Sequence, residues 1–487
     1  MQRRQPVGYL ELIDEYKENI ISDLKELIAI PSVLAPAVID KDYGKLPFGK
    51  EVDNAFRWML ARAELDGFKT VNVDNYGGHI EMEAAEDSDD PEILGILGHL
   101  DVVPEGSGWK SGGGNPFSGE VADGKIYGRG SSDDKGPVLA AYYGMKALKE
   151  SGFVPKKRVR IILGLDEETQ WEGMHYYLEH VDKVPTFGFT PDADFPAIHG
   201  EKGILVFRLA KKIGKSNNKG LELRSLTGGN AANMVPDSAR AVVKNEQGGA
   251  YEVIREKAAA FREETGYHLQ VKGVGKNLEI TTAGKSAHGS TPWMGENAIA
   301  ILYKFLGELS FANDDVNEFI SFVNEYIGFE VNGESMGCGF TDEPSGDLVF
   351  NLGVSKMTPE VGELTVNIRY PVTFTEEAVY DGMMPILNKY NFGIVKEKGR
   401  EPIYFPADDP LIVTLMDIYR EQTGDKESKP IVIGGGTYAR ATKGIVAFGP
   451  KFPDEPEMAH QKDEYISVDS LMKAAKIYAE AIKRLAE

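Results

Sequence analysis

The chain has 487 residues, 42% of them hydrophobic, so it is long enough for two or three domains with apolar cores. Its 54 basic and 76 acidic residues give a net charge of −22, which opposes binding to nucleic-acid phosphates and to anionic lipid. No stretch approaches the roughly 18 consecutive apolar residues of a membrane-spanning helix, so the sequence predicts neither a nucleic-acid nor a membrane partner.

The N-terminus and the cysteine content predict a cytoplasmic protein. Arg3 and Arg4 are not followed by an apolar block, so no export signal is expected. Cys338 is the single cysteine, which excludes an intrachain disulfide framework and a cysteine-rich metal site.

The first part of the chain alternates between helical and strand patterns. Residues 11–30 predict a helix, 91–104 contain a short buried strand, and 159–168 form another buried strand with acidic last residues. Between them, residues 133–152 predict a helix with Pro137 near its start and Gly152 just past its end. This alternation predicts an α/β fold with a mostly parallel sheet and helices on both faces.

From about Gly203 the pattern changes to alternating strands and two helical stretches, and the α/β pattern resumes near Pro406 with helices in 408–424 and 467–487. We therefore predict a discontinuous catalytic domain, residues 1–202 and 403–487. An inserted α+β lid domain, residues 203–402, would hold the substrate and could contain two similar halves.

His99 and Asp101 follow an apolar run, so they lie at the end of a strand, where residues two apart point to the same side. One could bind a metal while the other orients it, because a metal-bound imidazole usually donates its second N–H to a carboxylate or carbonyl. An isolated pair of this type is more often an ordinary histidine and a loop acid.

Acidic residues recur at later loops and strand ends. They are Asp133, Asp134, Glu167, Glu168, Asp192 and Asp194. Groups at the carboxyl ends of strands in an open α/β sheet converge on one crevice, and packed carboxylates require a cation. His460 would supply a second imidazole. The other histidines outside the inserted AHGSTP motif lack such acidic context and are interpreted as structural or surface residues: His79, His175, His180, His199 and His268.

Motifs in a fixed order carry a resemblance over essentially the whole chain. They are GHLDVVP, GRGSSDDKGP, LDEET, PDADFP, AHGSTP, NIRYP, GGGTYAR and MAHQKDE. In this order they resemble the dizinc exopeptidase family that includes carnosinases, carboxypeptidase G and succinyl-diaminopimelate desuccinylase. GGNAANMVPD, NIRYP, GGGTYAR and the chain length look most like its bacterial Xaa-His dipeptidase (PepV) subgroup.

The resemblance implies two divalent metal ions, zinc first and manganese or cobalt as alternatives. Asp133 would bridge both ions, and its peptide bond to Asp134 would be cis. Asp101 would support the ligand His99, and Glu167 would be the general base. The implied ligand sets are His99, Asp133 and Asp192 for one ion and His460, Asp133 and Glu168 for the other.

The resemblance also assigns substrate-binding groups. His288 would stabilise the oxyanion, and Asn233, Arg369 and the backbone at Gly436 would position the substrate. Arg369 alone would most simply be a surface salt-bridge residue, but a guanidinium can bind a substrate carboxylate in bidentate fashion. Closure of the insert on the catalytic domain is expected to complete the site.

The implied activity is the hydrolysis of dipeptides by a metal-activated water, with dipeptides as the only expected partners. Two alternatives stay open: an N-acyl amino acid deacylase or desuccinylase of the same family, and a catalytically silent metal- or peptide-binding protein. The long insert could mimic the second half of a dimer within one chain, so a monomer is expected.

Overall fold

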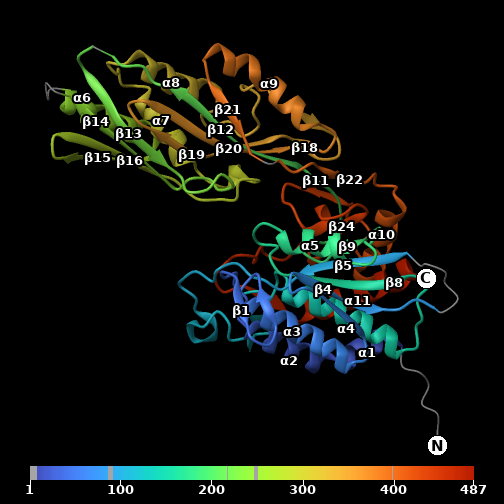
Figure 1. Cartoon of the computed structure of the whole chain (residues 1–487). Coiled ribbons are helices and arrows are strands. Elements are labelled where there is room, and N and C mark those ends of the chain that lie inside the picture. Colours follow the sequence, from blue (N-terminus) through green and yellow to red (C-terminus); the bar gives the residue numbers. More distant parts are fainter. Residues whose placement is uncertain (1–7, 86–91, 217, 246–249, 398) are drawn as a thin grey trace, which may run out of the picture. The chain divides into compact units, whose positions relative to one another are not determined.

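The computed structural model describes residues 8–85, 92–216, 218–245, 250–397 and 399–487; Arg3 and Arg4 lie outside them. The chain divides into two compact units (Figure 1): unit 1 comprises Met1–His199, Phe405–Ile431 and Gly436–Glu487, and unit 2 comprises Gly200–Tyr404 and Val432–Gly435. Residues 432–435, which the sequence placed in the catalytic domain, thus belong to unit 2. Their backbone forms a hydrogen bond within unit 2, since Lys202 N donates to Ile433 O at 2.9 Å.

Unit 1 is built on a sheet whose central strands, β24, β9, β5 and β8, are parallel, with antiparallel strands at both edges. Seven of its nine strands are, in spatial order, β11 (Ala197–Glu201), β24 (Ile445–Phe448), β9 (Phe187–Thr190), β5 (Ile93–His99), β8 (Arg158–Gly164), β4 (Gly77–Met82) and β3 (Lys69–Val73). The other two, β22 (Ile403–Tyr404) and β23 (Ile431–Ile433), both pair with β11. Because β5, β8 and β9 run the same way, their carboxyl ends lie at one edge of the sheet.

Helices cover both faces of this sheet, as the sequence predicted. A Cβ at Gly78 would meet Phe56 of α3 (Lys50–Leu65), whereas one at Gly77 would meet Tyr177 of α5 (Glu172–His180). Successive strand residues point to opposite faces, so α3 and α5 lie on different sides. The core cluster that contains Phe56 also includes residues of α4 (Lys135–Glu150), α10 (Pro410–Thr423) and α11 (Val468–Ala486).

The single helix predicted for residues 11–30 is wrong in one respect. The structure has two helices, α1 (Tyr9–Glu15) and α2 (Lys17–Ile28), with Tyr16 between them. The helix predicted for 133–152 is confirmed as α4, and Gly152 beyond it has the positive φ of +87° that favours glycine.

Unit 2 contains one antiparallel sheet of eight strands. In spatial order they are β15 (His268–Val274), β16 (Asn277–Ala283), β14 (Ser238–Asn245), β13 (Leu221–Gly228), β19 (Val349–Met357), β20 (Val361–Tyr370), β12 (Gly203–Lys212) and β21 (Gly393–Lys396). The two central strands, β13 and β19, each form a hairpin with the next strand, which a helix then connects to an edge strand.

The described part of unit 2 has four α-helices, whereas the sequence predicted two helical stretches. They are α6 (Ala250–Thr265), α7 (Ala298–Leu306), α8 (Asp314–Tyr326) and α9 (Glu376–Lys389). Their apolar residues join those of the sheet in a second core cluster. Pro385 lies inside α9, which weakens the helical pattern of that segment.

Short elements complete the fold. The antiparallel sheet β6 (Glu120–Ala122), β7 (Lys125–Tyr127) and β26 (Tyr465–Ser467) joins two loops that are distant in sequence. The others are β1 (Val38–Asp40), β2 (Gly44–Leu46), β10 (Ala193–Asp194), β17 (Thr341–Asp342), β18 (Gly346–Asp347), β22 (Ile403–Tyr404), β23 (Ile431–Ile433), β25 (Pro450–Lys451) and the 3₁₀ turns η1 (Ser111–Gly114), η2 (Pro292–Met294) and η3 (Tyr438–Arg440).

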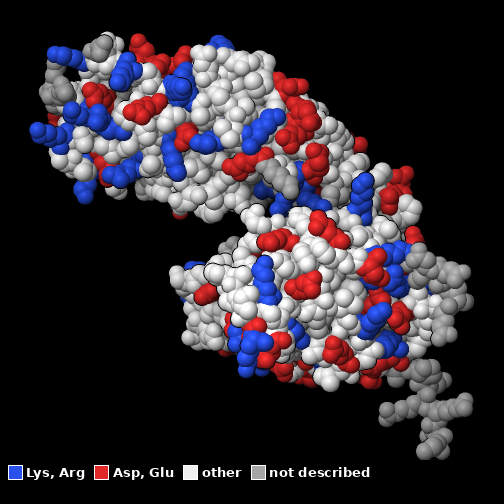
Figure 2. All heavy atoms as spheres, viewed as in Figure 1, with Lys and Arg blue, Asp and Glu red and all other residues white. Residues whose placement is uncertain are grey.

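The surface carries mixed charge. Figure 2 shows basic and acidic side chains interspersed over the visible face of each unit. Among the described helices, none combines the length and the apolar character needed to cross a bilayer.

Candidate active site

The predicted metal ligands of unit 1 lie where strands and loops end. His99 is the last residue of β5, Glu168 follows β8, and Asp192 follows β9. Since these parallel neighbours end at one edge, their side chains meet there. Asp133 ends the loop before α4, and His460 lies in the loop before β26.

The ligand atoms form two groups that share Asp133. His99 Nε2 lies 3.0 Å from Asp133 Oδ1 and 3.8 Å from Asp192 Oδ2. His460 Nε2 lies 3.1 Å from Asp133 Oδ2 and 3.0 Å from Glu168 Oε1. Within each group the candidate ligand atoms all lie within 4.8 Å of one another. The structure therefore brings together the two sets of three residues named from the sequence.

The loop before α4 has the backbone that the resemblance implied. The Asp133–Asp134 peptide bond is cis. The carboxylate of Asp134 is fully buried, and its Oδ2 accepts a hydrogen bond from the backbone N–H of His99 at 3.1 Å. Asp134 thus ties the end of β5 to the start of α4.

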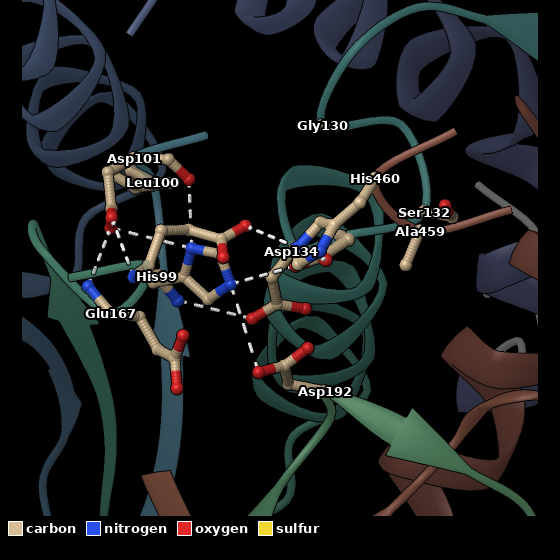
Figure 3. A network of polar contacts seen from close by, with 12 residues as sticks. His99, Leu100, Asp101, Gly130, Ser132, Asp134, Glu167, Asp192, Ala459 and His460 are labelled. Carbon is tan, nitrogen blue, oxygen red and sulfur yellow. Dashed lines mark hydrogen bonds and ion pairs between the residues drawn. The ribbon is translucent and has the colours of Figure 1, made fainter. Parts of the chain in front are cut away.

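Asp101 supports His99 mainly through its backbone. His99 Nδ1 lies 2.9 Å from Asp101 O and 3.4 Å from the carboxylate Oδ1, and Figure 3 shows the imidazole between Asp101 and Asp192. The carboxylate accepts hydrogen bonds from the backbone N–H groups of Glu167 and Glu168, at 3.2 and 3.1 Å. Asp101 therefore connects the loops after β5 and β8 while it orients the imidazole.

The electrostatics of this cluster suit divalent cations. Burial, with the charge of Asp133, raises the pKa of Asp192 well above its ordinary value and also raises the pKa of Glu168. Against the effect of burial, hydrogen bonds from His460 and His99 hold the pKa of Asp133 below its ordinary value. Carboxylates packed together in this way need positive charge, and imidazole nitrogen with carboxylate oxygen is a typical zinc ligand set.

Glu167 lies near His99 (Figure 3) but belongs to neither group of candidate ligands. Burial, with the charges of Glu168 and Asp101, raises the pKa of its carboxyl to about 8. The indole N–H of Trp171 donates to Glu167 O at 2.6 Å and fixes the backbone there. A carboxyl with a pKa near neutrality can both accept and donate a proton.

Glu464 holds the Asp133 loop, a role that the sequence analysis missed. Its Oε1 accepts hydrogen bonds from the backbone N–H groups of Gly130, Ser132 and Asp133, at 3.1, 3.0 and 3.3 Å. Its Oε2 pairs with buried Arg129 at 2.6 Å. The one signal in the sequence was its place at the end of the MAHQKDE motif.

Three of the predicted substrate-binding residues lie in unit 2. Asn233 and His288 occupy adjoining loops, since Gly289 N donates to Asn233 O at 2.7 Å and Met234 forms a β-bridge with His288. Arg369 is buried near the end of β20, and its Nη1 donates to Gly434 O at 3.0 Å. The fourth, Gly436, belongs to unit 1 and lies in the loop before η3.

Comparison with known proteins identifies the class. The model of the family described as peptidase family M20/M25/M40 matches residues 95–484. The chain therefore belongs to this family of peptidases, and the resemblance noted in the sequence is confirmed.

Two bacterial proteins are similar to this chain over nearly its whole length. The chain is 38% identical over 474 residues to the Bacillus subtilis (strain 168) protein named "Putative dipeptidase YtjP", covering 97% of this chain and 98% of that one. It is 39% identical over 480 residues to a Staphylococcus epidermidis protein named "Putative dipeptidase", covering 98% of each.

Solved structures share the fold at much lower identity. The dipeptidase Dug1p from Saccharomyces cerevisiae has a TM-score of 0.55 at 14% identity over 98% of each chain. The aminoacylhistidine dipeptidase from Vibrio alginolyticus has a TM-score of 0.53 at 15% identity over 96% of this chain and 97% of that one. These similarities support the predicted two-part α/β architecture.

Proposed function

We propose that this chain is a two-metal dipeptidase that hydrolyses the peptide bond of Xaa-His and other dipeptides. The observation that carries the proposal is the pair of three-residue groups that share Asp133, with Glu167 beside them and outside both. The names of the bacterial relatives support dipeptides as substrates.

The metal ligands would be His99, Asp133 and Asp192 for one ion and His460, Asp133 and Glu168 for the other. Two divalent cations in this donor set would lower the pKa of a water and polarise the scissile carbonyl. Zinc is proposed because its usual ligands are imidazole nitrogen and carboxylate oxygen, with manganese or cobalt as substitutes.

The protein's own groups would move protons and hold the substrate. Glu167 would take a proton from the attacking water and return it to the leaving amine. His288 would donate a hydrogen bond to the oxyanion that develops on the carbonyl oxygen, which lowers the barrier because the charge appears in the transition state. Arg369 would bind the carboxylate of the substrate, and Asn233 and the backbone at Gly436 would position the peptide.

We also propose that the protein is a cytoplasmic monomer. A buried, free Cys338 suits a reducing compartment. The sheet of unit 2 consists of two four-stranded halves within one chain. This supports a monomer, because the second half could take the place of the same domain of a partner subunit. Sedimentation at the 53.5 kDa expected for one chain would agree with this, and a larger species would contradict it.

The decisive experiment is a hydrolysis screen of the purified protein over dipeptides, tripeptides and N-acyl amino acids, with zinc, manganese or cobalt added in turn. Dipeptides should be cleaved fastest. Preferential cleavage of N-acyl amino acids would replace the proposal by a deacylase, and the absence of any turnover would favour a binding protein.

A further inference from the structure

Two asparagines lie directly opposite each other on the neighbouring strands β19 and β20 of unit 2. Asn351 of β19 pairs with Asn367 of β20, and both side chains are buried, with 2% and 1% of their surface exposed. The adjacent residues Leu352 and Ile368 belong to the apolar core cluster. A buried amide is costly unless it forms hydrogen bonds, so its partners should reveal its role.

The side-chain amide of Asn351 donates two hydrogen bonds to the loop that carries Asn233. Its Nδ2 donates to Ala232 O at 2.7 Å and to Met234 O at 2.9 Å, the carbonyls on either side of Asn233. Within the described part of the chain its Oδ1 accepts no hydrogen bond, so the side-chain amide bonds to this loop alone. Rotation of this peptide segment would break one or both bonds.

The loop lies unusually close to β19. The register of β19 shifts between Leu352 and Val354, which leaves Gly353 at a bulge, and a Cβ there would lie 2.4 Å from Ala232 O. Because a glycine has no side chain, the loop can approach the strand at this position. A Cβ at Gly289, next to His288, would likewise lie 2.9 Å from Asn233 C.

Asn367 holds the guanidinium of Arg369. Its Oδ1 accepts a hydrogen bond from Arg369 Nε at 3.1 Å, and its Nδ2 donates to Leu205 O of β12 at 3.1 Å. The amide is therefore anchored on the neighbouring strand while it orients the arginine. Arg369 Nη1 donates to Gly434 O, so contacts at two sites fix the plane of the guanidinium.

We infer that Asn351 and Asn367 are positioning residues for substrate binding: Asn351 fixes Asn233 and the adjoining His288 loop, and Asn367 fixes the orientation of Arg369. The inference rests on the proposed function, which gives these three residues their roles. It adds that one cross-strand pair sets the geometry of all of them. Neither asparagine needs to touch the substrate.

The test for Asn367 compares a dipeptide with its C-terminal amide. Asn367→Leu should raise KM for the dipeptide about tenfold, since it removes a hydrogen bond to a charged group, and should raise KM for the amide several-fold less. Asn367→Asp keeps an oxygen acceptor toward Arg369 but loses the donor to Leu205 O and places a competing carboxylate beside the guanidinium, so it should not restore binding of the dipeptide carboxylate. In an Arg369→Ala background, Asn367→Leu should add little, because the group that it positions is absent.

The test for Asn351 uses Asn233→Ala as the background. Asn351→Leu should lower kcat/KM for the dipeptide about tenfold or more, because it frees the carbonyls that flank Asn233. The same change should cost much less when Asn233 is already alanine. Ser355→Ala is the matched control: it removes a buried hydrogen bond of β19, with Tyr303 at 2.9 Å, away from these loops. It should lower thermal stability and leave KM unchanged.

The outcomes separate the inference from the proposed function. The inference is wrong, and the asparagines are purely structural, if wild type cleaves a dipeptide but both asparagine variants act additively with their backgrounds and Asn367→Leu affects the dipeptide and its amide equally. If wild type cleaves no dipeptide, the proposed function is wrong. In that case the dissociation constant of a dipeptide is measured by calorimetry for the same single and double variants. Additive effects in these constants again overturn the inference.

Discussion

The two units hold their functional groups by different means. In unit 1, three carboxylates and two imidazoles form two groups whose candidate ligand atoms lie within 4.8 Å of one another, and these side chains shift the pKa values of their neighbours. In unit 2, neutral amides fix a loop and a single guanidinium through directed hydrogen bonds. The first arrangement depends on charge and therefore on cations and pH. The second depends on geometry, so it should respond to substitution far more than to salt or metal.

Metal removal should produce the largest difference between the units. Treatment with a chelator should abolish hydrolysis, because the carboxylate cluster then lacks the charge that balances it, and added zinc, manganese or cobalt should restore the activity. Metal content measured alongside turnover would check this. Full activity in the metal-free protein would falsify the role given to the cluster.

Glu167→Ala should remove proton transfer and leave the cluster intact. We expect kcat to fall about 10³-fold, within the range usual for a lost general base. The protein should retain two metal ions, because Glu167 belongs to neither ligand group. Glu168→Ala is the matched control and should lose metal as well. Loss of metal from the Glu167 variant would show that base and ligand had been exchanged.

Arg369→Ala should test unit 2 without disturbing unit 1. Loss of a charged hydrogen-bonding partner should raise KM for dipeptides roughly 10- to 100-fold, with a much smaller effect on their C-terminal amides. Metal content should stay the same. An equal effect on both kinds of substrate would remove the carboxylate-binding role.

The sequence predicted the first cluster better than the second. The motifs place His99, Glu168 and Asp192 after strands, and because parallel neighbours end at one edge, strand ends alone predict convergence. Contacts such as those of Glu464 and Asn351 depend on which loops lie side by side, and no local pattern encodes that. The sequence also missed two helices of unit 2.

Glu464→Gln should loosen the loop that carries Asp133, the proposed bridging ligand. A neutral amide cannot accept all of the hydrogen bonds that the carboxylate accepts from this loop and from Arg129, so Asp133 should be less well fixed. Partners of this type usually change metal affinity by about 10- to 100-fold. Titration of the metal-free protein with cobalt, followed by its absorption spectrum, measures the affinity independently of activity. Unchanged affinity would limit Glu464 to a structural role.

The smallest expected effect concerns how the stability of unit 1 depends on pH through a residue outside the carboxylate cluster. His79 is buried on β4, where the hydroxyl of Tyr177 lies 2.9 Å from its Nδ1 and Glu81 and Arg160 lie nearby. Burial, and then the charge of Arg160, lower the pKa of His79 from 6.5 to about 3. As the pH drops below 6.5, His79 therefore binds a proton in the unfolded chain but not in the folded protein. The free energy of unfolding falls as a result.

His79→Gln should remove this contribution. The difference in free energy of unfolding between wild type and variant should shrink by about 1 kcal/mol from pH 7 to pH 5.5, as the linkage relation requires. Urea denaturation of both proteins at the two pH values measures this change, and the subtraction cancels the titration of the proposed metal ligands. A constant difference for His79→Gln would show that burial does not lower the pKa of His79 in the folded protein.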